Sequence, residues 1–210
     1  YFSAIDGVHG QELWRTDGSG LGTYLLRDIC PGICGARDLW AVSNLAAAAG
    51  VLFFTANDGV HGNELWLTDG SALGTHMVRD IQPGWRSSSP AMFTVSGSQL
   101  FFLADDGSHG RELWRSDGTV AGTYLVADIQ PGRPDSGAGP MVASQSLLFF
   151  SVTAWDAPRG LWVSDGTGPG TSRVSEVQTN YSSFYKGHPF VVLPNGTLLF
   201  NGTSGSSDSE

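Results

Sequence analysis

Positive charge is scarce in this sequence, and lysine occurs only once, at Lys186. The 210 residues include 11 lysines and arginines against 20 acidic residues, and the formal net charge is −9. Nucleic acids and anionic membranes are bound through clustered lysines and arginines. The composition therefore argues against a nucleic acid or a membrane surface as the partner.

Long apolar segments are also missing. The longest apolar stretch, around residues 45–49, is far shorter than the ~20 residues that a membrane-spanning helix needs. No segment shows the 3.6-residue spacing of apolar side chains that marks an amphipathic helix. Glycine and proline are frequent instead, with 29 and 10 residues, so we expect a chain that turns often.

Cysteine occurs only twice, at Cys30 and Cys34. Two cysteines without a second pair do not supply the four ligands of a structural zinc site. A local disulfide between Cys30 and Cys34 is predicted if the compartment is oxidising, and two free thiols are the alternative.

Against these absences stands a motif of eight residues that occurs four times. Its copies are ELWRTDGS at 12–19, ELWLTDGS at 64–71, ELWRSDGT at 112–119 and a divergent GLWVSDGT at 160–167. They recur about every 48 residues, which indicates a repeat architecture. Catalysis usually needs one asymmetric set of residues, whereas repetition supplies scaffold and surface, so we expect no enzymatic activity and no catalytic residues.

Each repeat contains four short segments with the composition of strands. In the clearest copy they are residues 100–104, 112–115, 123–129 and 140–144, separated by turns rich in Asp and Gly. Four antiparallel strands in a unit of this length are typical of a β-propeller blade, and a solenoid of stacked sheets is the rival fold. The motif tryptophans are expected to fill the spaces between blades: Trp14, Trp66, Trp114 and Trp162.

The repeat thus predicts an all-β chain in one β-propeller domain. We expect blade 1 at residues 1–50 with a truncated first strand, blade 2 at 51–98, blade 3 at 99–146, a degenerate blade 4 at 147–196, and the start of a further blade at 197–210. Both ends fall inside repeats, so the chain is expected to be a fragment of about four blades of a larger protein.

Together with the Gly-Thr that follows it, the motif resembles that of the ELWxxDGT-repeat proteins, over nearly the whole chain. The resemblance implies a β-rich repeat fold and a secreted or surface-attached setting, and it supplies no activity. The sequence departs from the pattern at Gly160, which replaces the glutamate, and at residues 155–159. The fourth copy is therefore expected to have lost the role of those residues.

The hairpin at residues 16–23 also resembles the Asp-box of sialidases and other propellers, a structural turn that lies away from the active site. The resemblance implies that the repeated aspartates stabilise turns. Calcium binding is the alternative, because calcium prefers oxygen ligands. These aspartates are Asp17, Asp69, Asp117 and Asp165.

A second turn places an Asp, a His and a Glu close together in three repeats. We expect the Asp to cap its own turn and the His to bond to the backbone. A divalent metal site is the alternative, but no metal or other cofactor is the primary prediction. The residues are Asp6, His9 and Glu12, then Asp58, His61 and Glu64, then Asp106, His109 and Glu112.

Three further aspartates, Asp28, Asp80 and Asp128, end the third strand of their repeats. They are candidates to form ion pairs with a repeated arginine such as Arg15 or Arg115, which would fix the register of the blades.

Three N-glycosylation sequons begin at Asn180, Asn195 and Asn201. Two of them contain Asn-Gly, which is also a common turn pair. Together with the cysteine pair and the acidic composition, they favour a secreted glycoprotein.

Aromatic residues outside the repeated positions are candidates to contact a glycan or a protein partner, and local packing in loops is the alternative. They are Trp40, Trp85, Trp155, Tyr181, Phe184 and Tyr185, with Trp85 and residues 181–185 as the first candidates. The function expected from all these features is a non-enzymatic extracellular module, structural or interacting with other protein subunits of a cell-surface, matrix or appendage assembly. A carbohydrate-binding, lectin-like propeller is the alternative, and part of a secreted glycoside hydrolase is the second.

Overall fold

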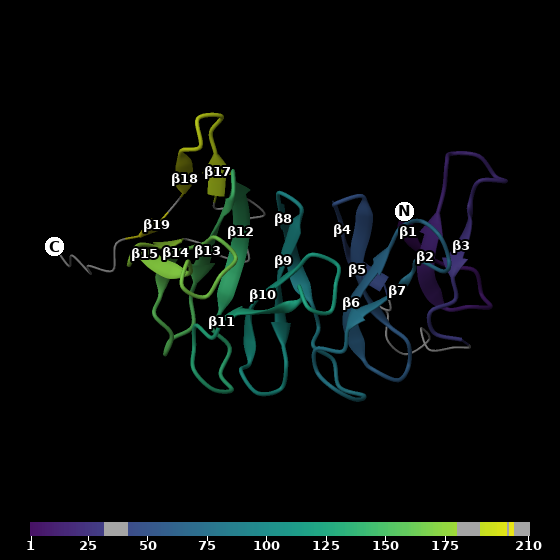
Figure 1. The fold of residues 1–210 in the computed structure, drawn as a ribbon, viewed down its shortest axis with the longest axis horizontal. Coiled ribbons are helices and arrows are strands. Elements are labelled where there is room, and N and C mark those ends of the chain that lie inside the picture. The colour runs from purple at the N-terminus through teal and green to yellow at the C-terminus, as the bar shows by residue number, and fades with distance from the viewer. Residues whose placement is uncertain (32–41, 180–189, 201, 204–210) are drawn as a thin grey trace.

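The structure, a computed structural model, describes residues 1–31, 42–179, 190–200 and 202–203. Every regular element in these ranges is a β-strand, as the repeat predicts (Figure 1). No helix in this part of the chain is long and apolar enough to cross a membrane.

Most strands form four antiparallel sheets that follow one another along the long axis of the molecule (Figure 1). The first sheet holds β1 (Phe2–Ile5), β2 (Gln11–Arg15) and β3 (Tyr24–Arg27). The second holds β4 (Val42–Ala48), β5 (Val51–Asn57), β6 (Asn63–Thr68) and β7 (His76–Arg79). The third holds β8 (Ala91–Ser96), β9 (Gln99–Asp105), β10 (Arg111–Ser116) and β11 (Tyr124–Ala127). The fourth holds β12 (Ala138–Ser144), β13 (Leu147–Val152), β14 (Gly160–Ser164) and β15 (Ser172–Ser175).

Two short strand pairs follow the fourth sheet. One joins β16 (Gln178–Thr179) to β19 (Gly202–Thr203), and the other joins β17 (Phe190–Val192) to β18 (Leu198–Phe200).

The observed sheets begin at different strands from the predicted units. The second, third and fourth sheets each start with the strand that the prediction placed at the end of the preceding unit. Units at 51–98 and 99–146 separate β4 from β5 and β8 from β9, yet these strands pair along their length. The reason is local: β4 and β5 are joined by only Ala49 and Gly50, which form a tight hairpin, whereas the long segment 80–90 separates β7 from β8. The repeating sheets are therefore 42–79, 91–127 and 138–175.

The same irregularity occurs in all four sheets between the leucine and the tryptophan of the motif. The register of β6 against β7 shifts between Leu65 and Trp66, and β2, β10 and β14 shift at the corresponding step. A bulge of this kind increases the local twist and changes the direction of the following side chain. It is a repeated feature of the third strand of each repeat, while the motif strand keeps its alternation. The extra residues are Leu26, Val78, Val126 and Val174.

The core lies between neighbouring sheets. Trp66 is 5% exposed and packs with Leu13 and Leu26 of the first sheet, and its ring centre lies 6.4 Å from that of Phe54. Trp114 is 4% exposed and lies in a cluster with Phe53 of the second sheet. Each of these tryptophans thus packs against the preceding sheet.

The outer copies of the tryptophan are less buried. Trp162 is half-buried at the edge of the cluster between the third and fourth sheets. Trp14 is half-buried and belongs to none of the buried clusters, since no described sheet precedes the first one.

The first strands of successive sheets lie next to each other. β4 contacts β8, β8 contacts β12, and β12 contacts β17. Each sheet then continues outward in chain order from this shared edge. The first strands of successive sheets therefore form one row, and the described strands do not close into a ring.

Candidate functional site

The turns between β2 and β3, β6 and β7, β10 and β11, and β14 and β15, here called the Asp turns, share one hydrogen-bond pattern. In the second sheet Asp69 Oδ1 accepts bonds from the backbone N–H and the hydroxyl of Ser71, at 2.8 and 2.7 Å. Ser71 Oγ accepts from the N–H of Gly74 at 2.9 Å. The Thr75 hydroxyl donates to the Ser71 carbonyl at 2.7 Å. The other three turns repeat these bonds at Asp17, Asp117 and Asp165.

The glycine at the end of each Asp turn is required by a close approach. A Cβ on Gly74 would lie 2.1 Å from Asp69 Oδ1, and Gly22, Gly122 and Gly170 are equally close to their aspartates. The hydrogen bonds from Ser71, its hydroxyl first and then its backbone N–H, lower the pKa of Asp69. The carboxylate is thus ionised and engaged by its own turn, which is the geometry of a turn-stabilising group.

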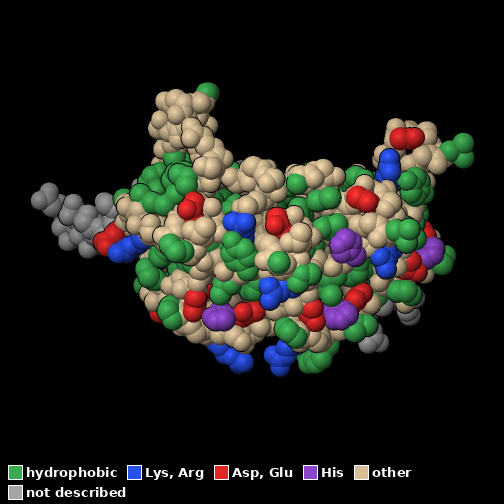
Figure 2. All heavy atoms as spheres, viewed as in Figure 1, with side chains coloured by type: hydrophobic (Ala, Val, Ile, Leu, Met, Phe, Trp, Pro, Cys, Tyr) green, Lys and Arg blue, Asp and Glu red, His purple; other side chains and the backbone are tan. Residues whose placement is uncertain are grey.

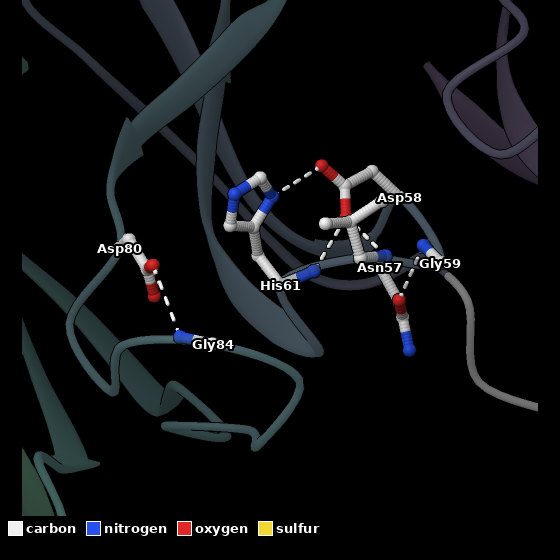
Figure 3. Close-up of polar contacts among 7 residues, drawn as sticks. Asn57, Asp58, Gly59, His61, Asp80 and Gly84 are labelled. Carbon is white, nitrogen blue, oxygen red and sulfur yellow. Dashed lines mark hydrogen bonds and ion pairs between the residues drawn. The ribbon is translucent and has the colours of Figure 1, made fainter.

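The turns between β1 and β2, β5 and β6, and β9 and β10, here called the His turns, also share one pattern (Figure 3). Asp58 Oδ1 accepts from the backbone N–H groups of Val60 and His61, both at 2.9 Å. His61 Nδ1 lies 2.7 Å from Asp58 Oδ2. The corresponding distances are 2.6 Å for His9 and Asp6 and 2.8 Å for His109 and Asp106.

The His–Asp pair changes the pKa of both partners. Burial acts to raise the pKa of Asp58, but the backbone and side-chain hydrogen bonds from His61 outweigh it, and the pKa is lowered. The same side-chain bond raises the pKa of His61 above 6.5. Acidic and histidine side chains lie close together along the lower edge of the face in Figure 2, so the charge of this edge depends on pH.

The side chain of the motif glutamate points away from the His turn and into the interior of the protein. Glu64 is fully buried and accepts bonds from the N–H groups of Ile81 and Ser88 at 3.0 and 2.9 Å, and from the Ser88 hydroxyl at 2.6 Å. Glu12 and Glu112 accept two backbone N–H bonds each from the same segment of their own repeats. The glutamate therefore fixes the loop that leads to the next sheet.

Burial of the glutamate has an electrostatic consequence. Desolvation raises the pKa of Glu64 to about 7, against the opposing effect of its hydrogen bonds. The pKa of Glu112 is also raised to about 7, again through burial.

The metal alternative for the His turn is not supported by this geometry. The Asp and His side chains bond to each other at the surface, while the Glu points into the protein and caps a different loop. In the ranges that the structure describes, no group of three or more His, Cys, Asp or Glu side chains is placed to hold a metal ion.

The prediction of ion pairs between the aspartates that follow the third strands and the repeated arginines is wrong. Arg15 Nη1 and Arg115 Nη1 instead donate to the carbonyls of Gly70 and Gly166, each at 3.2 Å. These carbonyls belong to the Asp turn of the next sheet. The carboxylate of Asp80 accepts instead from the Gly84 N–H at 3.3 Å (Figure 3). The arginine thus holds adjacent sheets together through a neutral acceptor.

A second arginine bridge between sheets comes from the end of the third strand. Arg79 Nη1 donates to the Thr123 carbonyl at 2.6 Å, and Arg27 Nη1 donates to the Thr75 carbonyl. The sequence offered no signal for these bonds, because donor and acceptor lie more than 40 residues apart.

The fourth repeat lacks the Asp, His and Glu, and its backbone has changed accordingly. Gly160 has φ +132°, and a Cβ there would lie 1.9 Å from the Ser175 carbonyl oxygen. A glutamate does not fit at this position without a shift of the backbone, so the loss of the motif glutamate is a structural change of the whole turn.

Apart from Cys30, the remaining predicted residues lie at the surface or outside the described ranges. Trp85 is 79% exposed, with the Arg86 guanidinium 5.6 Å from its ring centre. Asn195 is exposed in the turn between β17 and β18, and its Oδ1 accepts from the Thr197 N–H at 3.0 Å. Cys30 is buried. Outside the described residues lie Cys34, Trp40, Asn180, Tyr181, Phe184, Tyr185 and Asn201.

Comparison with known proteins gives a fold and no family. No protein-family model matches the chain, and no curated protein matches its sequence. The solved structure of TolB from Acinetobacter baumannii is similar, with a TM-score of 0.51 and 13% identity, over 96% of this chain and 45% of that chain. The computationally designed Ika8 protein has a TM-score of 0.42 and 18% identity, over 93% of this chain and 52% of that chain.

The chain therefore spans about half the length of the solved chains that it resembles. TolB contains a β-propeller domain, so its likeness supports a propeller-type arrangement of the sheets. At 13% identity it shows the fold alone.

Proposed function

We propose that the chain is part of a non-enzymatic interaction module in an extracellular assembly, built as a β-propeller whose repeated sheets act as blades. The main support is the use of the repeated polar side chains. The Asp turns, the His turns and the buried glutamates hold the turns and loops in place. Function is then left to the loops that differ between repeats.

A described hollow next to the second Asp turn offers little for catalysis. It has a volume of about 390 Å³ and is lined by Tyr1, residues 47–52, Thr68 and Asp69. Asp69 is its one carboxylate, and this group is already engaged by Ser71. A glycoside hydrolase generally needs two carboxylates that flank the bond to be cleaved, so the hydrolase alternative gains no support here.

An extracellular setting is favoured by the sequons and by the paired cysteine positions. The Asn195 side chain is exposed in a hairpin turn, where a glycan has room. A disulfide between Cys30 and Cys34 would close a loop next to the backbone N–H that Glu12 binds.

Two measurements on the natively purified protein test this proposal. Intact mass with peptide mapping should find a glycan at Asn195 and a bridge between Cys30 and Cys34. Cross-linking with mass spectrometry should find the variable loops linked to the same protein subunits in repeated preparations. An unmodified Asn195 with free thiols would contradict the extracellular setting, and hydrolysis of a glycoside substrate would contradict the non-enzymatic role.

A carbohydrate-binding role is the second candidate, and one observation favours it. The fourth repeat presents an exposed tryptophan, Trp155, at a position where the other repeats have the residues of the His turn.

A further inference from the structure

The turn between β13 and β14 differs from the His turns of the other sheets. Residues 153–159 have lost the Asp-Gly-x-His-Gly pattern and contain Trp155 instead. This tryptophan is 92% exposed, although the Arg159 guanidinium lies 3.9 Å from its ring centre. The guanidinium occupies one side of the indole, so the opposite face is open to solvent.

The turn is held by bonds that do not involve the indole. Arg159 Nε donates to the Ala154 carbonyl at 2.9 Å, and the Ala157 N–H donates to the same carbonyl at 3.4 Å. Trp162 Nε1 donates to the Pro158 carbonyl at 2.9 Å. The Arg159 side chain is therefore fixed over the ring by a bond of its own.

The base of the turn is tied to the segment that precedes β12. The N–H groups of Thr153 and Ala154 donate to the carbonyls of Gly137 and Ser136, at 3.1 and 3.3 Å. A Cβ on Gly137 would lie 2.5 Å from Ala154 N, so the two segments are in close contact. The turn is thus anchored at both ends, and Trp155 is presented on a rigid support.

The residues next to the exposed ring in the turn are of mixed character, with Pro158 as the one exposed apolar neighbour. Thr153 and Asp156 are exposed, and Arg159 is half-buried. Protein-binding hot spots lie in well-packed pockets enclosed by other contacts, and a ring that is 92% exposed lies in no such pocket. Stacking of nucleic acid bases is disfavoured by the net charge of −9.

We propose that the turn formed by Trp155, Asp156 and Arg159 is a binding site for a neutral carbohydrate chain. One face of a pyranose ring carries axial C–H groups that pack flat on an indole, while its equatorial hydroxyls project at the rim. The Arg159 guanidinium, 3.9 Å from the ring centre on the other side of the indole, supports the ring for this stacking. The inference names the site and the ligand class of the second candidate function, carbohydrate binding, and rests on that function.

The chain provides a matched control in Trp85. It is also exposed and also adjacent to an arginine, but the Arg86 guanidinium lies 5.6 Å from its ring centre. Trp85 lies in the loop from β7 to β8, and this loop contacts the His turn of its own sheet, where a Cβ on Gly62 would lie 2.4 Å from the Arg86 carbonyl oxygen. Trp85 and Trp155 are therefore at the same end of the sheets, with different degrees of support.

The test is calorimetric titration of the protein with neutral hexasaccharides of β-1,4-glucose, β-1,3-glucose, β-1,4-mannose and β-1,4-N-acetylglucosamine. We expect at least one to bind, with Trp155→Ala weakening the affinity tenfold or more and Trp155→Phe retaining part of it. Trp85→Ala should change the affinity less than twofold. Thermal unfolding of Trp155→Ala should match the wild type, since the ring is exposed.

Two results would overturn the inference: no binding of any of these hexasaccharides to the wild type, or equal affinities for the wild type and Trp155→Ala. Cross-links to protein subunits in the native preparation separate the two proposals. If the cross-links are found but no saccharide binds, only the proposed carbohydrate site is contradicted. If neither cross-links nor saccharide binding are found, the proposed interaction module is contradicted as well.

Discussion

The buried glutamates predict an unusual pH dependence of stability. In the unfolded chain Glu64 titrates near 4.5, and in the folded protein burial raises its pKa to about 7. Between these values the folded state holds a proton that the unfolded state has released. The free energy of unfolding therefore falls as the pH rises through this window, and the loss is complete above pH 7.

The size of the effect follows from the difference between the two pKa values. At ~1.4 kcal/mol for each pH unit, the contribution of Glu64 changes by about 3 kcal/mol. Glu112, whose pKa is also about 7, adds a change in the same direction. The His turns act in the same sense, because the raised pKa of each histidine means that its stabilising charge is lost as the pH rises.

The perturbation that isolates one glutamate is Glu64→Gln. The amide is neutral at every pH and keeps one oxygen, which can accept from the N–H of Ile81 or of Ser88 but not from both, because these groups donate to different oxygens of Glu64. The variant should be less stable than the wild type at pH 4.5, because one acceptor is lost. Its deficit should shrink or reverse by about 3 kcal/mol between pH 4.5 and pH 8.

The assay is urea unfolding of both proteins at several pH values between 4.5 and 8. The histidine contributions are common to both proteins and cancel in the difference. Glu176→Gln is the control: this carboxylate is exposed and pairs with Arg173 at the surface, at 3.0 Å, so its loss should change stability by less than about 1 kcal/mol at every pH. A wild-type stability that is constant or rises over this range, or an unchanged difference between wild type and Glu64→Gln, would refute the reasoning.

Three further changes test the framework. Trp114→Ala should destabilise the protein by about 3–5 kcal/mol in thermal unfolding, because the ring fills the core between the second and third sheets; a near-neutral result would place it outside that core. Gly74→Ala should cost about 1–3 kcal/mol, because its Cβ would displace the Asp69 carboxylate, while Gly20→Ala has open space and should be near neutral. Arg79→Met should lower stability by about 1–3 kcal/mol through loss of the bond to Thr123, measured by urea unfolding, and no change would show that the bridge between sheets is dispensable.

The Asp turns show what the sequence determined by itself. The bonds of Asp69 to Ser71 and of Ser71 to Gly74 span two and three residues, so the residue types and their spacing define the turn. The strands could be predicted for the same reason, since alternation and turn residues are local signals. The repeat period then indicated that sheets of one kind follow one another.

The alternation of side chains along the motif strand also predicts that the glutamate is buried. Glu64 lies two residues before Trp66 in β6, so both side chains are on the same face of the sheet and both are buried. The partners of the glutamate, 17 and 24 residues away, could not be identified from this pattern.

Only the tertiary structure decided which strands form one sheet, where the glutamate binds and what the arginines hold. Arg15 reaches a carbonyl 55 residues away, and nothing in the local sequence distinguishes that acceptor from the carboxylate of Asp28. The choice depends on how neighbouring sheets pack, because packing determines which groups lose their water and which acceptors come within reach. Local hydrogen bonds and periodicity could therefore be read from the chain, and contacts between sheets could not.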